Sequence, residues 1–182
     1  MLEIEVKLPI ENLSAVRTQL ETLGWTRGER LLERNTVYDA PDRALDRAGK
    51  LLRIRESGDR ALLTVKLPAP SEGPHKVREE HNLEGPGPTL ERIVEGLGFA
   101  SAWRYEKYRT RYRKAGEEGV IELDETPVGN FLELEGAPEW IDATAAALGY
   151  RPEDYETATY RELFLAWQRR RPSPPRDMVF AG

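Results

Sequence analysis

The residues of this chain best suited to chemistry are acidic and basic side chains placed at alternate positions. The first of these segments, Glu3-Ile4-Glu5-Val6-Lys7, puts charged residues on one parity and aliphatic residues on the other. Alternate side chains of a β-strand point to opposite faces, so the pattern predicts a strand with one charged face. The charged or polar positions that share a parity, here and in later segments, are Glu3, Glu5 and Lys7; Arg53 and Arg55; Thr64 and Lys66; Arg78, Glu80 and Asn82; Lys107, Arg109, Arg111 and Arg113; Glu122 and Asp124; and Glu133 and Glu135.

These charged faces are sorted by sign, and the sorting indicates a polyanion site. A single charged strand is most often a solvated face of an ordinary sheet. Here, however, acids lie on the first and last segments and bases on the middle ones. A sheet curled into a tunnel would therefore have one basic wall and one acidic wall. Arginine and lysine are the usual ligands of polyphosphate, and carboxylates beside phosphate imply bridging Mg²⁺ or Mn²⁺.

The composition narrows the chemistry further. The chain has 182 residues, no cysteine and two histidines, so disulfides, thiolate catalysis and cysteine or histidine-rich zinc sites are excluded. A metal would have to be held by carboxylates, which favours Mg²⁺, Mn²⁺ or Ca²⁺. The net charge of −5 argues against broad nucleic-acid binding. With no apolar run of transmembrane length and no visible signal peptide, we expect a cytoplasmic protein.

The hydrophobic pattern predicts an α+β fold in one domain. Amphipathic periodicity, often ended by Leu-Gly-aromatic, predicts helices over 11–23, 89–97, 139–148 and 159–170. Period-two alternation predicts strands over 2–8, 51–56, 60–67, 76–83, 105–114, 119–125 and 131–136, with 34–39 a weaker candidate. This order favours a largely antiparallel barrel with helices outside. The basic, proline-rich segment 169–182 is expected to be a disordered tail.

The ordered set of motifs resembles the CYTH superfamily, the triphosphate tunnel metalloenzymes. The N-terminal signature of that family is Glu-x-Glu-x-Lys, and the resemblance covers residues 1–168. The matching segments are Glu3-Ile4-Glu5-Val6-Lys7; Tyr38-Asp39; Leu52-Arg53-Ile54-Arg55; Thr64-Val65-Lys66; Arg78-x-Glu80; Lys107-x-Arg109; Leu123-Asp124; Gly129-x-Phe131-x-Glu133-x-Glu135; and Tyr160. The resemblance implies an eight-stranded antiparallel tunnel, a small-molecule triphosphate substrate and dependence on Mg²⁺ or Mn²⁺.

The same resemblance assigns roles to individual positions. The implied metal ligands are Glu3, Glu5, Glu80, Asp124, Glu133 and Glu135, with Glu80 in a supporting role. The implied phosphate ligands are Lys7, Arg53, Arg55, Lys66, Arg78, Lys107, Arg109 and Arg111, of which Lys7, Arg55 and Lys66 are the bases expected to act in catalysis. Some members place a basic residue of a C-terminal helix over the tunnel mouth. The late bases here are Arg161 and Arg169 to Arg171, and the sequence does not show which of them, if any, takes that position.

The sequence leaves several functions open. A metal-dependent triphosphatase acting on tripolyphosphate, thiamine triphosphate or a nucleoside triphosphate is the first hypothesis. A class IV adenylyl cyclase would use the same phosphate ligands on ATP, and a noncatalytic polyphosphate-binding module is the third reading. The four tryptophans are expected to anchor helix packing, although one at a tunnel mouth could contact a nucleoside or thiamine ring. A homodimer is compatible with the sequence, whereas a membrane or a stable nucleic-acid partner is not expected.

Overall fold

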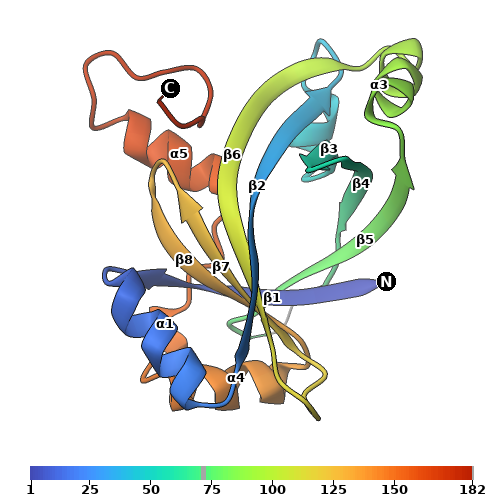
Figure 1. Ribbon diagram of the computed structural model, residues 1–182. Coiled ribbons are helices and arrows are strands. Elements are labelled where there is room, and N and C mark those ends of the chain that lie inside the picture. The colour runs from blue at the N-terminus through green and yellow to red at the C-terminus, as the bar shows by residue number, and fades with distance from the viewer. Residues whose placement is uncertain (71–72, 182) are drawn as a thin grey trace.

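The computed structural model describes residues 1–70 and 73–181, and over these residues eight strands close into an antiparallel barrel (Figure 1). The strands are β1 (Leu2–Ile10), β2 (Thr26–Asp39), β3 (Leu51–Ser57), β4 (Arg60–Pro68), β5 (Lys76–Gly85), β6 (Ala100–Arg113), β7 (Val120–Thr126) and β8 (Gly129–Glu135). Around the barrel they follow the order β1-β5-β4-β3-β2-β6-β7-β8. The predicted α+β fold, an eight-stranded barrel with helices outside, is confirmed.

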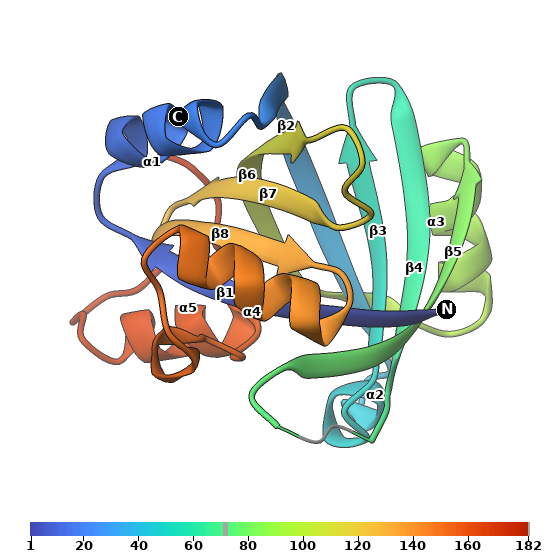
Figure 2. The ribbon, with the colours of Figure 1, turned by 90° about the horizontal axis from the view of Figure 1, so that it is seen from below.

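Helices pack on the outer, aliphatic faces of the strands, as Figure 2 shows for α1 and α4. The helices are α1 (Leu13–Thr22), α2 (Ala44–Arg47), α3 (Gly87–Gly96), α4 (Pro138–Ala147) and α5 (Tyr160–Gln168), with a short 3-10 turn at Pro152–Asp154. Leu8 and Leu132 pack with Ile141 of α4, and Ile54 packs with Leu90 of α3. Because the outer faces bury the aliphatic residues, the charged residues of the same strands must point inward. Across residues 1–70 and 73–181, no helix combines the length and apolarity needed to cross a bilayer.

Strand β2 is longer than the sequence pattern indicates. The weak candidate 34–39 is only its last part, because the strand begins at Thr26 and pairs with β6 along most of its length. Residues 26–31 are exposed, and their polar side chains give no period-two signal. Gly28 allows the close approach of β6, since a Cβ there would lie 2.8 Å from the carbonyl oxygen of Arg111. Backbone pairing, and not a buried face, therefore holds this part of the strand.

The sequence predicts a disordered tail over 169–182, and the structure places the second half of this segment against the barrel. Met178 is 1% exposed and forms a parallel bridge with Tyr105. Its N–H donates to the carbonyl oxygen of Arg104 at 3.0 Å, and its own carbonyl accepts from the N–H of Glu106 at 2.8 Å. β7 pairs with β6 only from residue 108 onward, so this stretch of the β6 edge is open for the tail. The prolines and charges of the tail suggested disorder, but its short apolar end covers an unpaired strand edge. Residue 182, the last of the predicted tail, lies outside the described residues.

Candidate active site

The inward faces of the barrel strands line one cavity with a volume of about 560 Å³. Alternation along the strands brings side chains from all eight strands onto its surface; β7 contributes Glu122, whereas Asp124 does not line the cavity. The predicted site residues that line the cavity are Glu3, Glu5, Lys7, Arg53, Arg55, Lys66, Arg78, Glu80, Lys107, Arg109, Arg111, Glu133 and Glu135. The structure thus brings together residues that are up to about 130 positions apart in the chain. Their roles as metal or phosphate ligands remain predictions.

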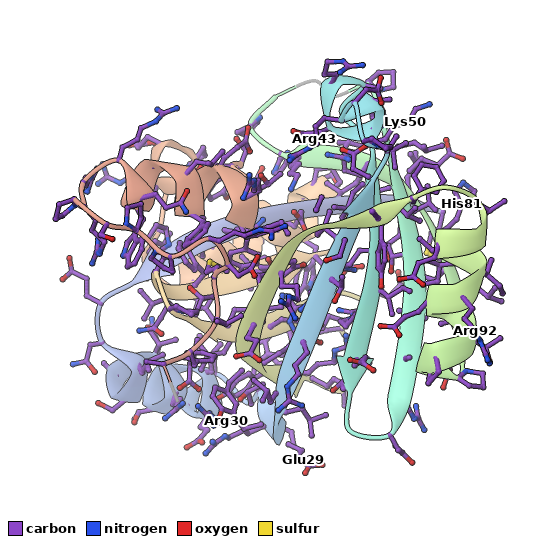
Figure 3. The ribbon with its side chains drawn as sticks, turned by 90° about the horizontal axis from the view of Figure 1, so that it is seen from above. Glu29, Arg30, Arg43, Lys50, His81 and Arg92 are labelled. Atoms are coloured by element: carbon purple, nitrogen blue, oxygen red, sulfur yellow. The ribbon has the colours of Figure 1, made fainter. Side chains whose placement is uncertain are left out.

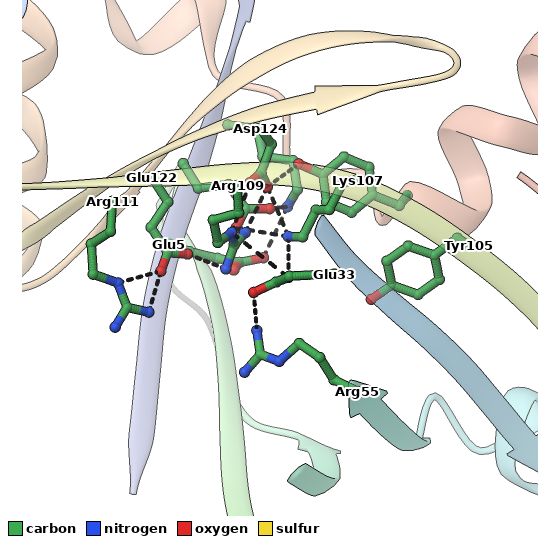
Figure 4. Close-up of polar contacts among 12 residues, drawn as sticks. Glu5, Glu33, Arg55, Tyr105, Lys107, Arg109, Arg111, Glu122 and Asp124 are labelled. Atoms are coloured by element: carbon green, nitrogen blue, oxygen red, sulfur yellow. Dashed lines mark hydrogen bonds and ion pairs between the residues drawn. The ribbon is translucent and has the colours of Figure 1, made fainter. Parts of the chain in front are cut away.

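Asp124 lies behind this lining as the centre of a buried hydrogen-bond network. Its carboxylate has no exposed surface and accepts a hydrogen bond from Lys107 Nζ at 2.8 Å (Figure 4). Arg109 donates two further bonds, at 2.7 and 2.6 Å, and the hydroxyl of Tyr160 donates a fourth at 2.6 Å. In this arrangement Asp124 holds the two bases in place. Its predicted role as a metal ligand would require some of these bonds to be exchanged.

Arg109 joins acids from three strands. It pairs with Glu122 on β7 and Glu133 on β8, and its Nε lies 4.0 Å from Oε2 of Glu33 on β2. Burial alone would lower the pKa of Arg109, but the neighbouring carboxylates outweigh it and raise that pKa. Arg111 lies further along β6, where its half-exposed side chain donates from Nε to Glu122 Oε1 at 2.9 Å. This part of the tunnel is therefore a network of mutually compensated charges.

The lysines and glutamates of β1, β4 and β5 form ion pairs with one another inside the cavity. Lys66 on β4 pairs with Glu3, and its Nζ lies 2.7 Å from Oε2 of Glu80. Lys7 donates to Glu5 at 3.0 Å, and both side chains are buried. Burial raises the pKa of Glu3 to about 7, although Lys66 favours its charged form. Glu3 is therefore an incompletely compensated acid inside the cavity.

The predicted arginines of β3 and β5 have different surroundings. Arg53 Nη1 donates to the hydroxyl of Tyr105 at 2.9 Å, and Arg55 Nη1 donates to Glu33 Oε1 at 3.3 Å. Arg78 instead donates to backbone carbonyl oxygens, the shortest contact being 2.8 Å. Within the described ranges Arg78 has no carboxylate within ion-pair distance. Its guanidinium is held at the edge of the cavity, whereas Arg53 and Arg55 reach into it.

Several buried polar residues at the site had no assigned role in the sequence analysis. Glu33 contacts Arg55, Lys107 and Arg109, and Lys76 donates to Glu5 at 2.8 Å. Other examples are Tyr105 and Glu122, described above, and Asn35, whose amide is buried without a hydrogen-bond partner in the described structure. These residues could have been found because they share a strand face with predicted site residues. Lys76 precedes Arg78 by two residues, and Tyr105 precedes Lys107 by two. Glu33, Asn35 and Asp39 likewise share a face. The first part of β2 has no period-two pattern, so the alternation of Glu33, Asn35 and Asp39 was not recognised as one face of a long strand.

The acidic side of the cavity fits a divalent cation by its donor chemistry. The register places Glu5 directly opposite Glu135, and Glu122 directly opposite Glu133. Like charges at paired positions destabilise a sheet. Burial, followed by the charges of Glu122 and Glu5, raises the pKa of Glu135, which has no basic partner within ion-pair distance in the described part of the chain. No three acids or histidines of residues 1–70 and 73–181 already converge as a finished site. Oxygen-binding ions such as Mg²⁺ or Mn²⁺ would relieve this repulsion.

Comparison with known proteins agrees with this geometry. A Methanocaldococcus jannaschii protein provisionally named an adenylate cyclase, MJ0240, is 29% identical over 136 residues, which is 74% of this chain and 77% of that protein. A Vibrio parahaemolyticus structure, also provisionally named an adenylate cyclase, superposes with a TM-score of 0.75 at 22% identity and covers 91% of this chain and 98% of its own. The Hippeastrum protein HpAC1, provisionally an adenylyl cyclase and described as having a dominant triphosphatase activity, superposes with a TM-score of 0.64 at 22% identity and covers 91% and 96%. Residues 1–160 match the CYTH domain, so the resemblance predicted from the motifs is confirmed and the chain belongs to the CYTH family.

Proposed function

We propose that this CYTH protein is a metal-dependent triphosphatase that hydrolyses the terminal phosphate of a triphosphate substrate. The observation that carries the proposal is the sorting of charge inside a closed tunnel. Bases from β3, β4 and β6 face acids from β1 and β8, and Glu135, directly opposite Glu5, has no basic partner within ion-pair distance in the described part of the chain. A binding module for polyanions would gain nothing from opposed carboxylates, since their repulsion costs stability when no cation is bound.

The basic residues would bind the phosphates by exchanging their present partners. Arg55 now pairs with Glu33 at 3.3 Å, and Lys66 pairs with Glu3 and Glu80. Phosphate oxygens can replace these carboxylates, because guanidinium and ammonium groups bind both anions with similar geometry. Arg53 and Lys107 are buried and already fixed by neighbours, so they would bind with little further loss of side-chain freedom.

Carboxylates of the acidic wall would hold the cation. The residues proposed for this role are Glu3, Glu5, Glu80, Asp124, Glu133 and Glu135. When bound, Mg²⁺ or Mn²⁺ supplies polarisation of the phosphoryl oxygens and a more acidic water. Lys7, Arg55 and Lys66 would stabilise the negative charge that develops as the terminal phosphoryl group leaves. Lys7 is suited to this because it stays charged: Glu5 and Glu133 raise its pKa against the effect of burial.

The second candidate is a class IV adenylyl cyclase, which the names of the Methanocaldococcus and Vibrio proteins favour. In that reaction the ribose 3′-hydroxyl of ATP attacks the α-phosphorus, and pyrophosphate leaves. The dominant triphosphatase activity described for the Hippeastrum protein favours hydrolysis for this architecture. Both reactions would use the same phosphate ligands, so the products must decide between them.

A product assay tests the proposal. Purified protein with Mg²⁺ or Mn²⁺ is offered ATP, tripolyphosphate and thiamine triphosphate, and the products are separated by anion-exchange chromatography. We expect the wild type to release orthophosphate. We expect the double variant that combines Glu133→Gln and Glu135→Gln to release none. Glu84→Gln is the matched control, because Glu84 lies on β5 with a 64% exposed side chain. Cyclic AMP with pyrophosphate would establish the cyclase instead, and tight triphosphate binding without any product would support the binding module.

A further inference from the structure

Helix α5 lies beside β6 (Figure 1) and brings one aromatic residue, Tyr160, to the tunnel. The Tyr160 ring centre lies 6.1 Å from that of Tyr105 on β6 and 5.7 Å from that of Phe131 on β8. Trp103 stacks between Tyr105 and Phe164, with ring centres 4.8 and 6.0 Å apart, and so packs α5 against β6. Tyr160 is 7% exposed and lines the cavity. It is neither a proposed phosphate ligand nor a proposed metal ligand.

The chain before α5 fixes the position of Tyr160. Glu156 and Lys7 form an isolated antiparallel bridge, in which the N–H of Lys7 donates to the carbonyl oxygen of Glu156 at 3.1 Å and the reverse bond is 2.8 Å long. Thr159 then begins the helix with a capping box. Its hydroxyl accepts from the N–H of Glu162 at 3.2 Å, and Glu162 Oε2 accepts from the N–H of Thr159 at 2.7 Å. Tyr160, the first helical residue, is therefore held between strand β1 and a capped helix start.

The hydroxyl of Tyr160 is committed to Asp124. It donates to Oδ2 at 2.6 Å, and Lys107 Nζ and Arg109 Nη2 donate to the same oxygen at 2.8 and 2.6 Å. Arg109 Nε donates to the other oxygen, Oδ1, at 2.7 Å. Because three donors converge on Oδ2, the carboxylate cannot rotate without breaking bonds to both α5 and β6. Tyr160 thus fixes the orientation of Asp124 and, through it, of the two bases that Asp124 holds.

The ring of Tyr160 lies near two ammonium groups that come from different strands. Nζ of Lys107 on β6 lies 4.9 Å from the ring centre, and Nζ of Lys7 on β1 lies 5.4 Å from it. Both lysine side chains are buried, and a cation within about 6 Å of an aromatic ring is attracted by the ring quadrupole. A lysine side chain loses rotamer freedom when it binds phosphate, so ordering beforehand lowers that cost. One ring therefore orders two of the proposed phosphate ligands.

We propose that Tyr160 is a positioning residue that joins the ammonium groups of Lys7 and Lys107 and the carboxylate of Asp124 into one fixed arrangement. The proposal rests on the proposed triphosphatase function and gives a task to a residue outside its phosphate and metal ligands. The two parts of the side chain act separately. The ring orders the lysines for phosphate binding, and the hydroxyl orients Asp124 and its bases for turnover. A residue that only filled space between α5 and β6 would show no such division.

Two variants separate the ring from the hydroxyl, each assayed on whichever of ATP, tripolyphosphate and thiamine triphosphate the wild type hydrolyses fastest. Tyr160→Phe keeps the ring, so kcat should fall about tenfold while KM stays within about twofold of the wild-type value. Tyr160→Leu removes both parts and should in addition raise KM about tenfold.

Two controls should keep the wild-type kcat and KM. Tyr150→Phe removes a hydroxyl that donates to the backbone carbonyl oxygen of Pro9 at 3.3 Å, outside the cavity lining. Phe164→Leu removes a buried ring of α5 that belongs to the same aromatic cluster and does not line the cavity. It therefore measures what a loss of packing alone does.

A measurement without ligand tests the same arrangement without turnover. In ¹H–¹³C spectra of protein labelled on its six lysines, the ε-methylene signals of Lys7 and Lys107 report the ring current of Tyr160. These signals should keep their wild-type shifts in Tyr160→Phe and in Phe164→Leu, and they should move in Tyr160→Leu. The signals of Lys66 and of the exposed Lys50, labelled in Figure 3, should stay unchanged in all variants.

Wild-type kcat in Tyr160→Phe would reject the task of the hydroxyl, and unmoved Lys7 and Lys107 signals in Tyr160→Leu would reject that of the ring; either result overturns the proposal. Equal kinetic losses in Tyr160→Leu and Phe164→Leu would overturn it as well, since packing alone would then explain them. If Tyr160→Leu does not fold, kcat of the isosteric Tyr160→Phe decides. If the wild type releases no orthophosphate from any substrate, the proposed function is refuted, and the lysine signals decide on Tyr160.

Discussion

Replacing Glu33 by glutamine should destabilise the fold and at the same time tighten triphosphate binding. Glu33 is 7% exposed and lies among Arg55, Lys107 and Arg109. Burial alone would raise its pKa, but these bases outweigh burial and lower the pKa from 4.5 to about 2. At roughly 1.4 kcal/mol per pKa unit, this difference corresponds to about 3 kcal/mol of stability near neutral pH.

The sign of this contribution predicts a pH dependence. Because the pKa is lower in the folded state, the stabilisation is complete above 4.5 and is lost as the pH falls toward 2. Urea unfolding of the wild type and Glu33→Gln should differ by about 3 kcal/mol at neutral pH and by about half of that near pH 3. Glu29→Gln, an exposed position on the same strand, is the control and should change little. Equal stability of Glu33→Gln and Glu29→Gln at neutral pH would refute the ion-pair reasoning.

The effect on ligand affinity has the opposite sign. In the wild type, phosphate must displace Glu33 from Arg55 and also approach the Glu33 charge. Removing that charge should lower the Kd for tripolyphosphate about tenfold, or ~1.4 kcal/mol, when calorimetry is done without divalent cations. Weaker binding by a folded Glu33→Gln protein would show that Glu33 positions Arg55 for phosphate and does not compete with it.

Other positions give simpler expectations. Arg55→Ala should raise KM and lower kcat, reducing kcat/KM by roughly a hundredfold in the orthophosphate assay, while the exposed Arg60→Ala should have little effect; normal kinetics would reject the role of Arg55. Glu5→Gln should cut turnover steeply and reduce the rise in melting temperature caused by Mn²⁺, and wild-type values of both would remove Glu5 from the metal site. Met178→Ala should lower the free energy of unfolding by about 2 kcal/mol. The control Val179→Ala, at a position that is 42% exposed, should lower it by less than ~0.5 kcal/mol. Equal effects of the two variants would mean that the tail contributes no buried contact.

The sequence predicted the barrel because its strands have one aliphatic and one charged face. Val6 and Leu8 must be covered, and the only way to cover them with helices leaves Glu5 and Lys7 inside. The alternation therefore specified both the core and the lining. The same reasoning located the residues that the structure brings to the cavity, although their separate roles rest on the family resemblance and await the experiments above.

The failures have a common physical cause, which is stabilisation by backbone pairing instead of side-chain burial. The first half of β2 is exposed and polar, and the tail segment around Met178 adds to an open edge of β6. Hydrogen bonds between strands leave no periodic trace in the side chains. Asp124 shows a second limit: its motif indicated a functional acid, but only the structure shows that four hydrogen bonds tie it to Lys107, Arg109 and Tyr160.

We expect a tunnel that carries its own counter-charges to bind the proposed substrate and cation together. The carboxylates partly neutralise the bases, since Arg109 and Lys66 each have more than one acidic partner. Leaving one member of a buried ion pair without its partner costs about 3–5 kcal/mol. A triphosphate that bound alone would take the bases from their carboxylate partners and leave those carboxylates unpaired. A cation that bound alone would instead leave the bases unpaired. Under the proposed function the two ligands together would supply both missing charges, so each should strengthen the binding of the other, and a preference for a metal–triphosphate complex would follow from the ion pairs of the tunnel.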